Sequence, residues 1–181
     1  MKLYYSPGAC SFSPHIVLLE AGLPFTLEKV DFKTKKTAAG IDFLTINSKG
    51  SVPALQLDDG RVLTEGPAVV QYLADQKPDS GLAPRAGTFE RYQLMEILNF
   101  ITSELHKTYG PLFNPKISAD WKASVLLILD KKLGKHLHGG GRVFVYRTAL
   151  VRPCRSRSDA LAGVDGLSVA RRATSESRTG A

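Results

Sequence analysis

The chain has 181 residues, of which 43% are hydrophobic and 23% are charged, and its formal net charge is +7. This composition is ordinary for a globular protein and excludes collagen-like, low-complexity and wholly disordered classes. The longest clear apolar run, 125–129, is far shorter than the ~18 residues that a membrane span needs. We expect one large or two small domains, no membrane segment, no secretory signal at the start, and a cytoplasmic location.

The predicted elements of residues 1–80 alternate between strand and helix. In chain order they are a strand (2–5), a helix (about 11–21), a strand (25–30), a polar loop (33–40), a short helix (41–46), a hairpin of two strands (51–63) and a helix from residue 67. Gly22 ends the first helix, Asp59-Gly60 marks the hairpin turn, and Pro67 begins the last helix. This order predicts a small α/β domain in which helices pack on a mixed sheet.

The remaining chain changes character twice. A Pro- and Gly-rich linker at 81–87 precedes a helical region at 88–138, with one helix over about 88–109 and a second that begins near Ser118. Beyond residue 138 helical periodicity ends. Two helices alone cannot cover each other's apolar stripes well, so we expect a partial helical domain followed by a poorly ordered tail at 139–181.

Most of the positive charge lies in this tail. Residues 139–181 hold 8 basic and 3 acidic residues, and every basic one is arginine, whereas all 13 lysines of the chain precede them. The tail has two aromatic residues, Phe144 and Tyr146, and no recognisable nucleic-acid motif. We therefore expect a solvated basic tail and no nucleic-acid partner.

Cys10 is the strongest candidate for chemistry. It lies between a predicted strand and a predicted helix, where amide groups and the helix dipole lower the pKa of a thiol. Ser13 stands where a CxxC motif has its second cysteine, so the thiol can form a mixed disulfide with a small thiol but has no internal resolving partner. The alternative is a small buried hydrophobe. Cys10 and Cys154 together make no disulfide framework.

Two dipeptides are candidate binding elements. The Val52-Pro53 bond is either cis, which would expose the Val52 backbone to an extended peptide-like ligand, or an ordinary strand start. Glu65-Gly66 opens a helix. Either the carboxylate binds a ligand ammonium while the free amides bind a ligand carboxylate, or Glu65 only complements the helix dipole.

Three cations have similar alternatives. Lys35 lies in a polar loop, where it either pairs with a carboxylate or stays solvated. His106 and Lys107 end the polar face of the long helix, where His106 either orients or deprotonates a thiol or complements the helix C-terminus. His136 and His138 form only an isolated H-x-H pair, so we expect no metal site.

Together these residues resemble the bacterial beta-class glutathione transferases. The resemblance rests on the opening MKLYYSPGACSFSPHIVLLEAGLPF and on three later blocks, NSKGSVPAL, LTEGPAVVQYLAD and LNFITSELHK. It covers roughly residues 1–135. It implies a thioredoxin-like α/β domain followed by an all-α domain, here truncated, and a homodimer.

The resemblance also implies roles for the candidate residues. Cys10 would face the glutathione sulfur, with Ser11 beside it, and Val52, next to Pro53, would pair with the cysteinyl backbone. The other contacts would be made by Glu65 and Gly66 with the γ-glutamyl end, by Lys35 with the glycine carboxylate, and by Asn99, His106 and Lys107 on the side of the second substrate. The implied reaction is attack of the thiolate of glutathione, the co-substrate, on an electrophilic small molecule.

The chain departs from the family pattern near residues 133–138. Farther on, Arg171 stands where a Ser/Thr-x-x-Asp capping box, here starting at Ser168, would have its acid. The hypothesis is that the tail is the product of a shifted reading frame, which reading the coding DNA in the other frames would test. Two alternatives to an active transferase stay open, namely a non-catalytic glutathione- or protein-binding thioredoxin-like module and an inactive truncated product.

Overall fold

The computed structural model describes residues 1–136, with side chains as far as residue 133. His138 and the predicted tail at 139–181, which includes Cys154, lie outside the described residues, so the structure does not bear on the reading-frame hypothesis. The strands are β1 (Lys2–Tyr5), β2 (Thr26–Asp31), β3 (Lys36–Thr37), β4 (Ala54–Gln56) and β5 (Val62–Thr64), and the helices are α1 (Phe12–Glu20), α2 (Gly66–Asp75), α3 (Phe89–Phe100), α4 (Lys107–Tyr109) and α5 (Ala119–His136). Within the described residues no helix is long and apolar enough to span a membrane.

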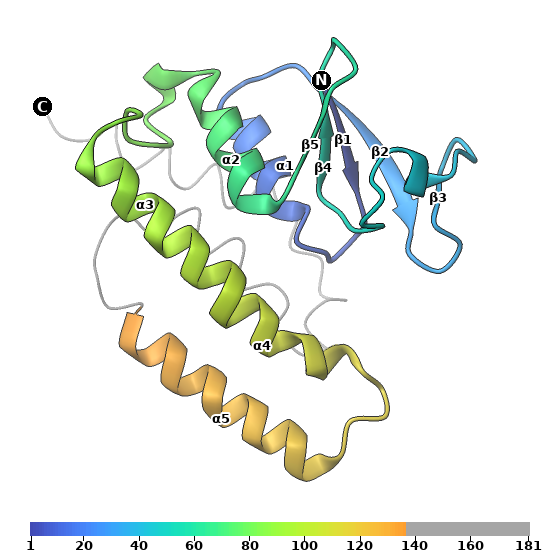
Figure 1. Ribbon diagram of the computed structural model, residues 1–181, viewed down its shortest axis with the longest axis vertical. Coiled ribbons are helices and arrows are strands. Elements are labelled where there is room, and N and C mark those ends of the chain that lie inside the picture. Colours follow the sequence, from blue (N-terminus) through green and yellow to red (C-terminus); the bar gives the residue numbers. More distant parts are fainter. Residues whose placement is uncertain (137–181) are drawn as a thin grey trace, which may run out of the picture.

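The five strands form one mixed sheet in the order β3-β2-β1-β4-β5. The central strand β1 runs parallel to β2 and antiparallel to β4, with Tyr4 opposite both Glu28 and Ala54. Strands β4 and β5 form the expected hairpin, in which Ala54 lies opposite Thr64. The ends of β1, β2 and β5 and the start of β4 therefore meet at the same edge of the sheet (Figure 1).

Each face of the sheet has its own core. Helices α1 and α2 cover one face through a cluster that includes Leu3, Leu18 and Leu73, each 0% exposed. The opposite face packs around Phe43 and Val30. This layered arrangement, followed by a helical region, confirms the expected fold class, because alternating strand and helix patterns bury their apolar sides against one another.

Two local predictions for the first 80 residues need correction. The predicted loop at 33–40 contains the short strand β3, which pairs antiparallel with β2. Its two residues, one exposed and one buried, are too few to show a strand pattern in the sequence. The predicted short helix at 41–46 is a 3₁₀ turn, Phe43–Thr45, whose N-cap Asp42 accepts a hydrogen bond from the Leu44 amide at 3.0 Å.

The long helix predicted over 88–109 is present but is not uniform. Thr88 caps α3, and a π-helical turn, Ile101–His106, separates α3 from the short α4. Lys132 of α5 donates hydrogen bonds to the Glu104 backbone oxygen at 3.2 Å and to its carboxylate at 2.7 Å. Local periodicity did not predict the π turn, which this distant helix contacts through Lys132.

Candidate functional site

Cys10 and Val52 meet at the edge of the sheet where β1 ends and β4 begins. The Cys10 thiol lies in the turn before α1 and donates a hydrogen bond to the Val52 carbonyl at 3.0 Å. The Val52-Pro53 peptide bond is cis, as the first of the two interpretations expects, while the binding of a peptide-like ligand there stays a prediction. The structure thus places the candidate nucleophile beside backbone that leads into β4.

The pKa of the Cys10 thiol is raised, which contradicts the expectation of a lowered value. Burial of the sulfur is the main cause, although part of the residue is open to solvent, and the negative charge of Glu65 adds to it. The amides of Cys10 and Ser11 act in the opposite direction but are outweighed. The thiol also donates its proton to the Val52 carbonyl, an interaction that favours the neutral form.

The Ser11 hydroxyl is engaged in the turn before α1. Ser11 is 1% exposed, and its oxygen accepts a hydrogen bond from the Ser6 amide at 3.2 Å and donates one to the Ser6 carbonyl at 3.3 Å. Ser11 occupies the N-cap position of α1 but makes no side-chain cap. Its hydroxyl therefore shapes the loop that carries Cys10.

Glu65 and Gly66 lie at the same edge of the sheet, where β5 leads into α2. Glu65 is the N-cap residue, with a positive φ of 69° and no side-chain cap. Its carboxylate, 59% exposed, forms an ion pair with Lys49 at 2.6 Å. A Cβ atom added to Gly66 would meet nothing within 4 Å, so packing inside the chain does not require glycine there.

Lys35 reaches the same loop system from the end of β2. Its ammonium group donates a hydrogen bond to the Gly50 carbonyl at 2.9 Å and lies 5.4 Å from the centre of the Phe32 ring. Gly50 is two residues before Val52 in the chain. The structure thus brings together the predicted binding residues that follow β1, β2 and β5 and precede β4.

The three residues predicted on the helical region lie apart from this group. Asn99, His106 and Lys107 are exposed on α3, on the π turn and on α4. Among the described contacts, no side-chain hydrogen bond or ion pair links them to the residues around Cys10. Their position relative to a bound substrate is therefore not fixed by direct contact with the Cys10 group.

Two other features of the described part of the chain lie apart from this arrangement or do not form a site. Among the side chains that the structure describes, residues 1–133, no group of three His, Cys, Asp or Glu residues could hold a metal ion. A small apolar hollow lies between α1, α2 and α3, lined in part by Val17, Val70 and Leu94. It does not include Cys10 or Glu65, so it is not the candidate site.

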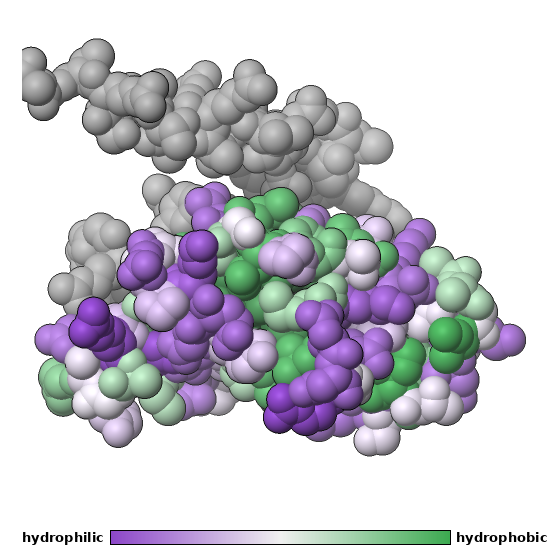
Figure 2. Space-filling view, turned by 90° about the horizontal axis from the view of Figure 1, so that it is seen from above, coloured by the Kyte–Doolittle hydropathy of each residue, from purple (hydrophilic) through white to green (hydrophobic). Residues whose placement is uncertain are grey.

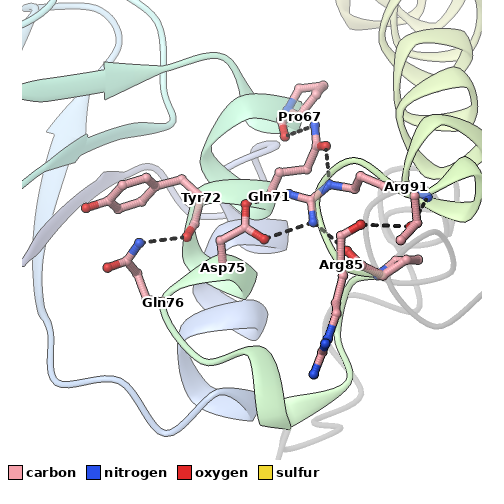
Figure 3. Close-up of polar contacts among 9 residues, drawn as sticks. Pro67, Gln71, Tyr72, Asp75, Gln76, Arg85 and Arg91 are labelled. Atoms are coloured by element: carbon pink, nitrogen blue, oxygen red, sulfur yellow. Dashed lines mark hydrogen bonds and ion pairs between the residues drawn. The ribbon is translucent and has the colours of Figure 1, made fainter.

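Three residues with clear polar roles escaped the sequence analysis. Lys49 pairs with Glu65, while Gln71 of α2 and Arg91 of α3 are hydrogen-bonded to each other (Figure 3). Each contact joins residues well separated in the sequence. No spacing pattern in a single sequence would have predicted them.

Comparisons with known proteins agree with this geometry. A family profile described as "Glutathione S-transferase, N-terminal domain" matches residues 8–76. The chain is 50% identical over 133 residues to glutathione S-transferase GstA of Escherichia coli O157:H7, a match that covers 74% of this chain and 66% of that protein. The chain spans about two thirds or less of the length of the curated relatives that it matches.

Solved structures extend the similarity to the fold. A beta-class glutathione S-transferase of Sphingomonas chungbukensis is 48% identical, with a TM-score of 0.75 over 82% of this chain and 78% of that one. A sphingomonad glutathione S-transferase complexed with glutathione is 44% identical, with a TM-score of 0.76 over 93% of this chain and 87% of that one.

Proposed function

The chain belongs to the glutathione S-transferase family, and we propose that it binds glutathione beside Cys10 and transfers its thiolate to an electrophilic small molecule. The observation that carries the proposal is the 3.0 Å contact between the Cys10 sulfur and the Val52 carbonyl. It places a thiol next to a backbone segment that can pair with an extended peptide. Glutathione matches both features, because it is a small peptide that carries a thiol.

The remaining groups at this edge of the sheet fit the two charged ends of glutathione. We assign Glu65 and the first amides of α2, including that of Gly66, to the γ-glutamyl ammonium and carboxylate. In the free protein the Glu65 carboxylate is paired with Lys49. The ligand ammonium would therefore share this carboxylate with Lys49 or displace Lys49 from it. Lys35 is assigned to the glycine carboxylate of glutathione. To bind it, the Lys35 ammonium would give up its hydrogen bond to the Gly50 carbonyl.

The second substrate would lie on the side of the helical region. Asn99, His106 and Lys107 are assigned to that side, and His106 is assigned the exchange of a proton with the reacting thiol. Ser11 is assigned a positioning role, because its hydroxyl is engaged by the Ser6 backbone.

The proposed site supports two reactions, one with glutathione and one with glutathione disulfide. In conjugation, the thiol loses its proton, the thiolate forms a bond to the electrophilic carbon, and the leaving group departs with its electron pair. In mixed-disulfide formation, the Cys10 thiolate attacks glutathione disulfide and releases one glutathione thiolate. The raised pKa of Cys10 makes the second reaction slow at neutral pH in the free protein.

The proposal extends to the setting of the reaction. Conjugation of this kind removes reactive electrophiles, which is a detoxifying role. We place the protein in the cytoplasm, where glutathione is kept reduced, and propose a homodimer, the assembly implied by the family resemblance. Size-exclusion chromatography with light scattering of the full chain tests the dimer, and a monomer at all concentrations would contradict it.

Glutathione-affinity capture followed by a conjugation assay tests the main proposal. The full chain should bind immobilised glutathione, elute with free glutathione, and conjugate chlorodinitrobenzene with release of chloride. Failure of capture would reject the proposal. Capture without conjugation would favour the non-catalytic binding module instead.

A mass measurement after treatment with glutathione disulfide locates the reactive thiol. Cys10→Ala should abolish the adduct of one glutathione per chain, whereas the matched variant Cys154→Ala should keep it. An adduct that survives Cys10→Ala and disappears in Cys154→Ala would show that Cys10 is not the site.

A further inference from the structure

Arg91, in the first turn of α3, is a buried cation whose donors are occupied by α2 and the linker. It is 6% exposed. Its guanidinium donates to the two Asp75 carboxylate oxygens at 2.9 and 2.5 Å and to the Pro84 carbonyl at 2.7 Å, while its Nε donates to the Gln71 side-chain oxygen at 3.1 Å (Figure 3). A buried charge is destabilising unless it is paired. These contacts therefore hold the guanidinium in one orientation.

The orientation of Arg91 determines that of the Gln71 amide. Arginine has only donors, so the oxygen of Gln71 must face Arg91 and its NH₂ group must face away. On that side the NH₂ group donates to the Pro67 carbonyl at 3.0 Å. Gln71 thus joins Arg91 of the helical region to the first turn of α2.

The first turn of α2 lacks a capping side chain. The N-cap residue, Glu65, makes no side-chain cap and has a positive φ, and Pro67 brings no backbone N–H. The Val69 amide donates to the Glu65 carbonyl at 3.0 Å. A side-chain contact to the Pro67 carbonyl can therefore influence the backbone conformation of the neighbouring residues Glu65 and Gly66.

We propose that Arg91 and Gln71 are positioning residues that hold the first turn of α2 in the conformation that binds glutathione. The inference rests on the proposed function, because it assigns this turn to the γ-glutamyl end. It predicts that glutathione affinity depends on a residue of the helical region that lies outside the candidate site. In this relay Arg91 orients Gln71, and Gln71 holds the Pro67 carbonyl.

The same helix offers a matched control. Gln76 donates its side-chain amide to the Tyr72 carbonyl at 3.3 Å, the same bond to the residue four positions earlier (Figure 3). Gln76 is exposed and makes no described contact with Arg91. Gln71→Met and Gln76→Met therefore remove the same kind of hydrogen bond, but only the first interrupts the relay.

The test combines hydrogen exchange of the full-length free protein with calorimetric titration of glutathione. Gln71→Met should speed exchange in the segment 65–71 and raise the Kd for glutathione about three- to ten-fold, the factor expected for one or two lost hydrogen bonds. Gln76→Met should leave both unchanged. The kcat at saturating glutathione should stay at the wild-type value, so that the loss is confined to the KM for glutathione.

A second variant separates the two links of the relay. Gln71→Glu keeps an acceptor for Arg91 but has no donor for the Pro67 carbonyl, so it should weaken glutathione binding at least as much as Gln71→Met. Wild-type exchange in segment 65–71 of Gln71→Met, or an equal effect of Gln76→Met, would overturn the inference. If the wild-type chain binds no glutathione, the proposed function fails, and the exchange result alone decides whether the relay holds the turn.

Discussion

Helices begin differently in the two regions of the molecule. In the first region, residues 1–80, the helices α1 and α2 have no side-chain cap. Ser11 has a hydroxyl at the N-cap position of α1, but this hydroxyl is bonded to the Ser6 backbone. In the helical region, Thr88 accepts a hydrogen bond from the Arg91 amide, and Ser118 accepts one from the Trp121 amide, both at 3.3 Å. The uncapped helices are those that begin at the edge of the sheet with Cys10 and Glu65. At α1 the Phe12 and Ser13 amides already donate to the Ala9 and Cys10 carbonyls, so the proposed anionic ligand group is left to the start of α2.

The two regions also differ in how completely their apolar side chains are buried. The first region has residues that are fully enclosed, such as Leu73 of α2. In the helical region, large apolar side chains remain open on α3 and α5, including Phe89 (73% exposed), Trp121 (53%) and Leu127 (56%). Figure 2 shows apolar patches that interrupt the hydrophilic surface of the face seen from above. We infer that the first region contributes most of the stability, because buried area is the main source of folding free energy.

The largest expected effect separates the two regions directly. Leu73→Ala should lower the free energy of unfolding by about 3 kcal/mol, because it leaves a cavity in an enclosed core. The matched change Leu127→Ala on α5 should lower it by less than about 0.5 kcal/mol, because that side chain is half exposed. Urea unfolding of the full chain measures both. Similar losses would show that the helical region is packed as tightly as the sheet region.

The next effect concerns the contact that joins the regions. Asp75→Asn removes the charge paired with Arg91 at 2.5 Å and should cost about 1–2 kcal/mol, since Arg91 is buried but Asp75 is 44% exposed. Asp59→Asn, which removes the charge of an exposed pair with Arg61, is the control and should leave the urea midpoint unchanged. An unchanged midpoint in Asp75→Asn would mean that the two regions do not depend on this pair.

Capping gives a smaller effect. Thr88→Ala should lower the free energy of unfolding by about 1 kcal/mol through loss of the α3 cap. Thr88→Ser keeps a hydroxyl and should recover most of this loss in the same urea titration. Equal instability of the two variants would assign the role of Thr88 to its methyl group and not to the cap.

The elements that the sequence predicted best are those with local patterns. The helix at about 11–21, the hairpin at 51–63 and the helix from residue 67 each have a turn or cap signal next to an apolar run, and the structure confirms all three. The π turn has no such signal, and its residue Glu104 is contacted by Lys132 of another helix. A contact over such a distance has no signature in local periodicity.

The candidate site shows the same limit. Position in the predicted elements singled out Cys10, Val52 and Glu65, the family resemblance gave them roles that stay predictions, and strand register explains why they lie at one edge of the sheet. The predicted lowering of the Cys10 pKa was wrong. Burial and the charge of Glu65 raise this pKa by more than the amides at the start of the helix lower it. The roles of Asn99, His106 and Lys107 stay predictions that substrate binding must test.

The smallest expected effect concerns this pKa. Because the pKa of Cys10 is raised, a smaller fraction of it is thiolate at neutral pH than in a free cysteine peptide, and iodoacetamide should alkylate it more slowly. Glu65→Gln removes a negative charge that disfavours the thiolate, so the pKa should fall and the pH profile of alkylation should move to lower pH. The shift should be modest, since burial is the larger cause and Lys49 already pairs with Glu65.

Rates followed in the Cys154→Ala background report Cys10 alone. Asp59 is an exposed carboxylate on the hairpin, so Asp59→Gln should not move the pH profile. A wild-type midpoint below that of a free cysteine would show that the helix amides control this thiol, and a shift to higher pH in Glu65→Gln would show that Glu65 does not disfavour its thiolate.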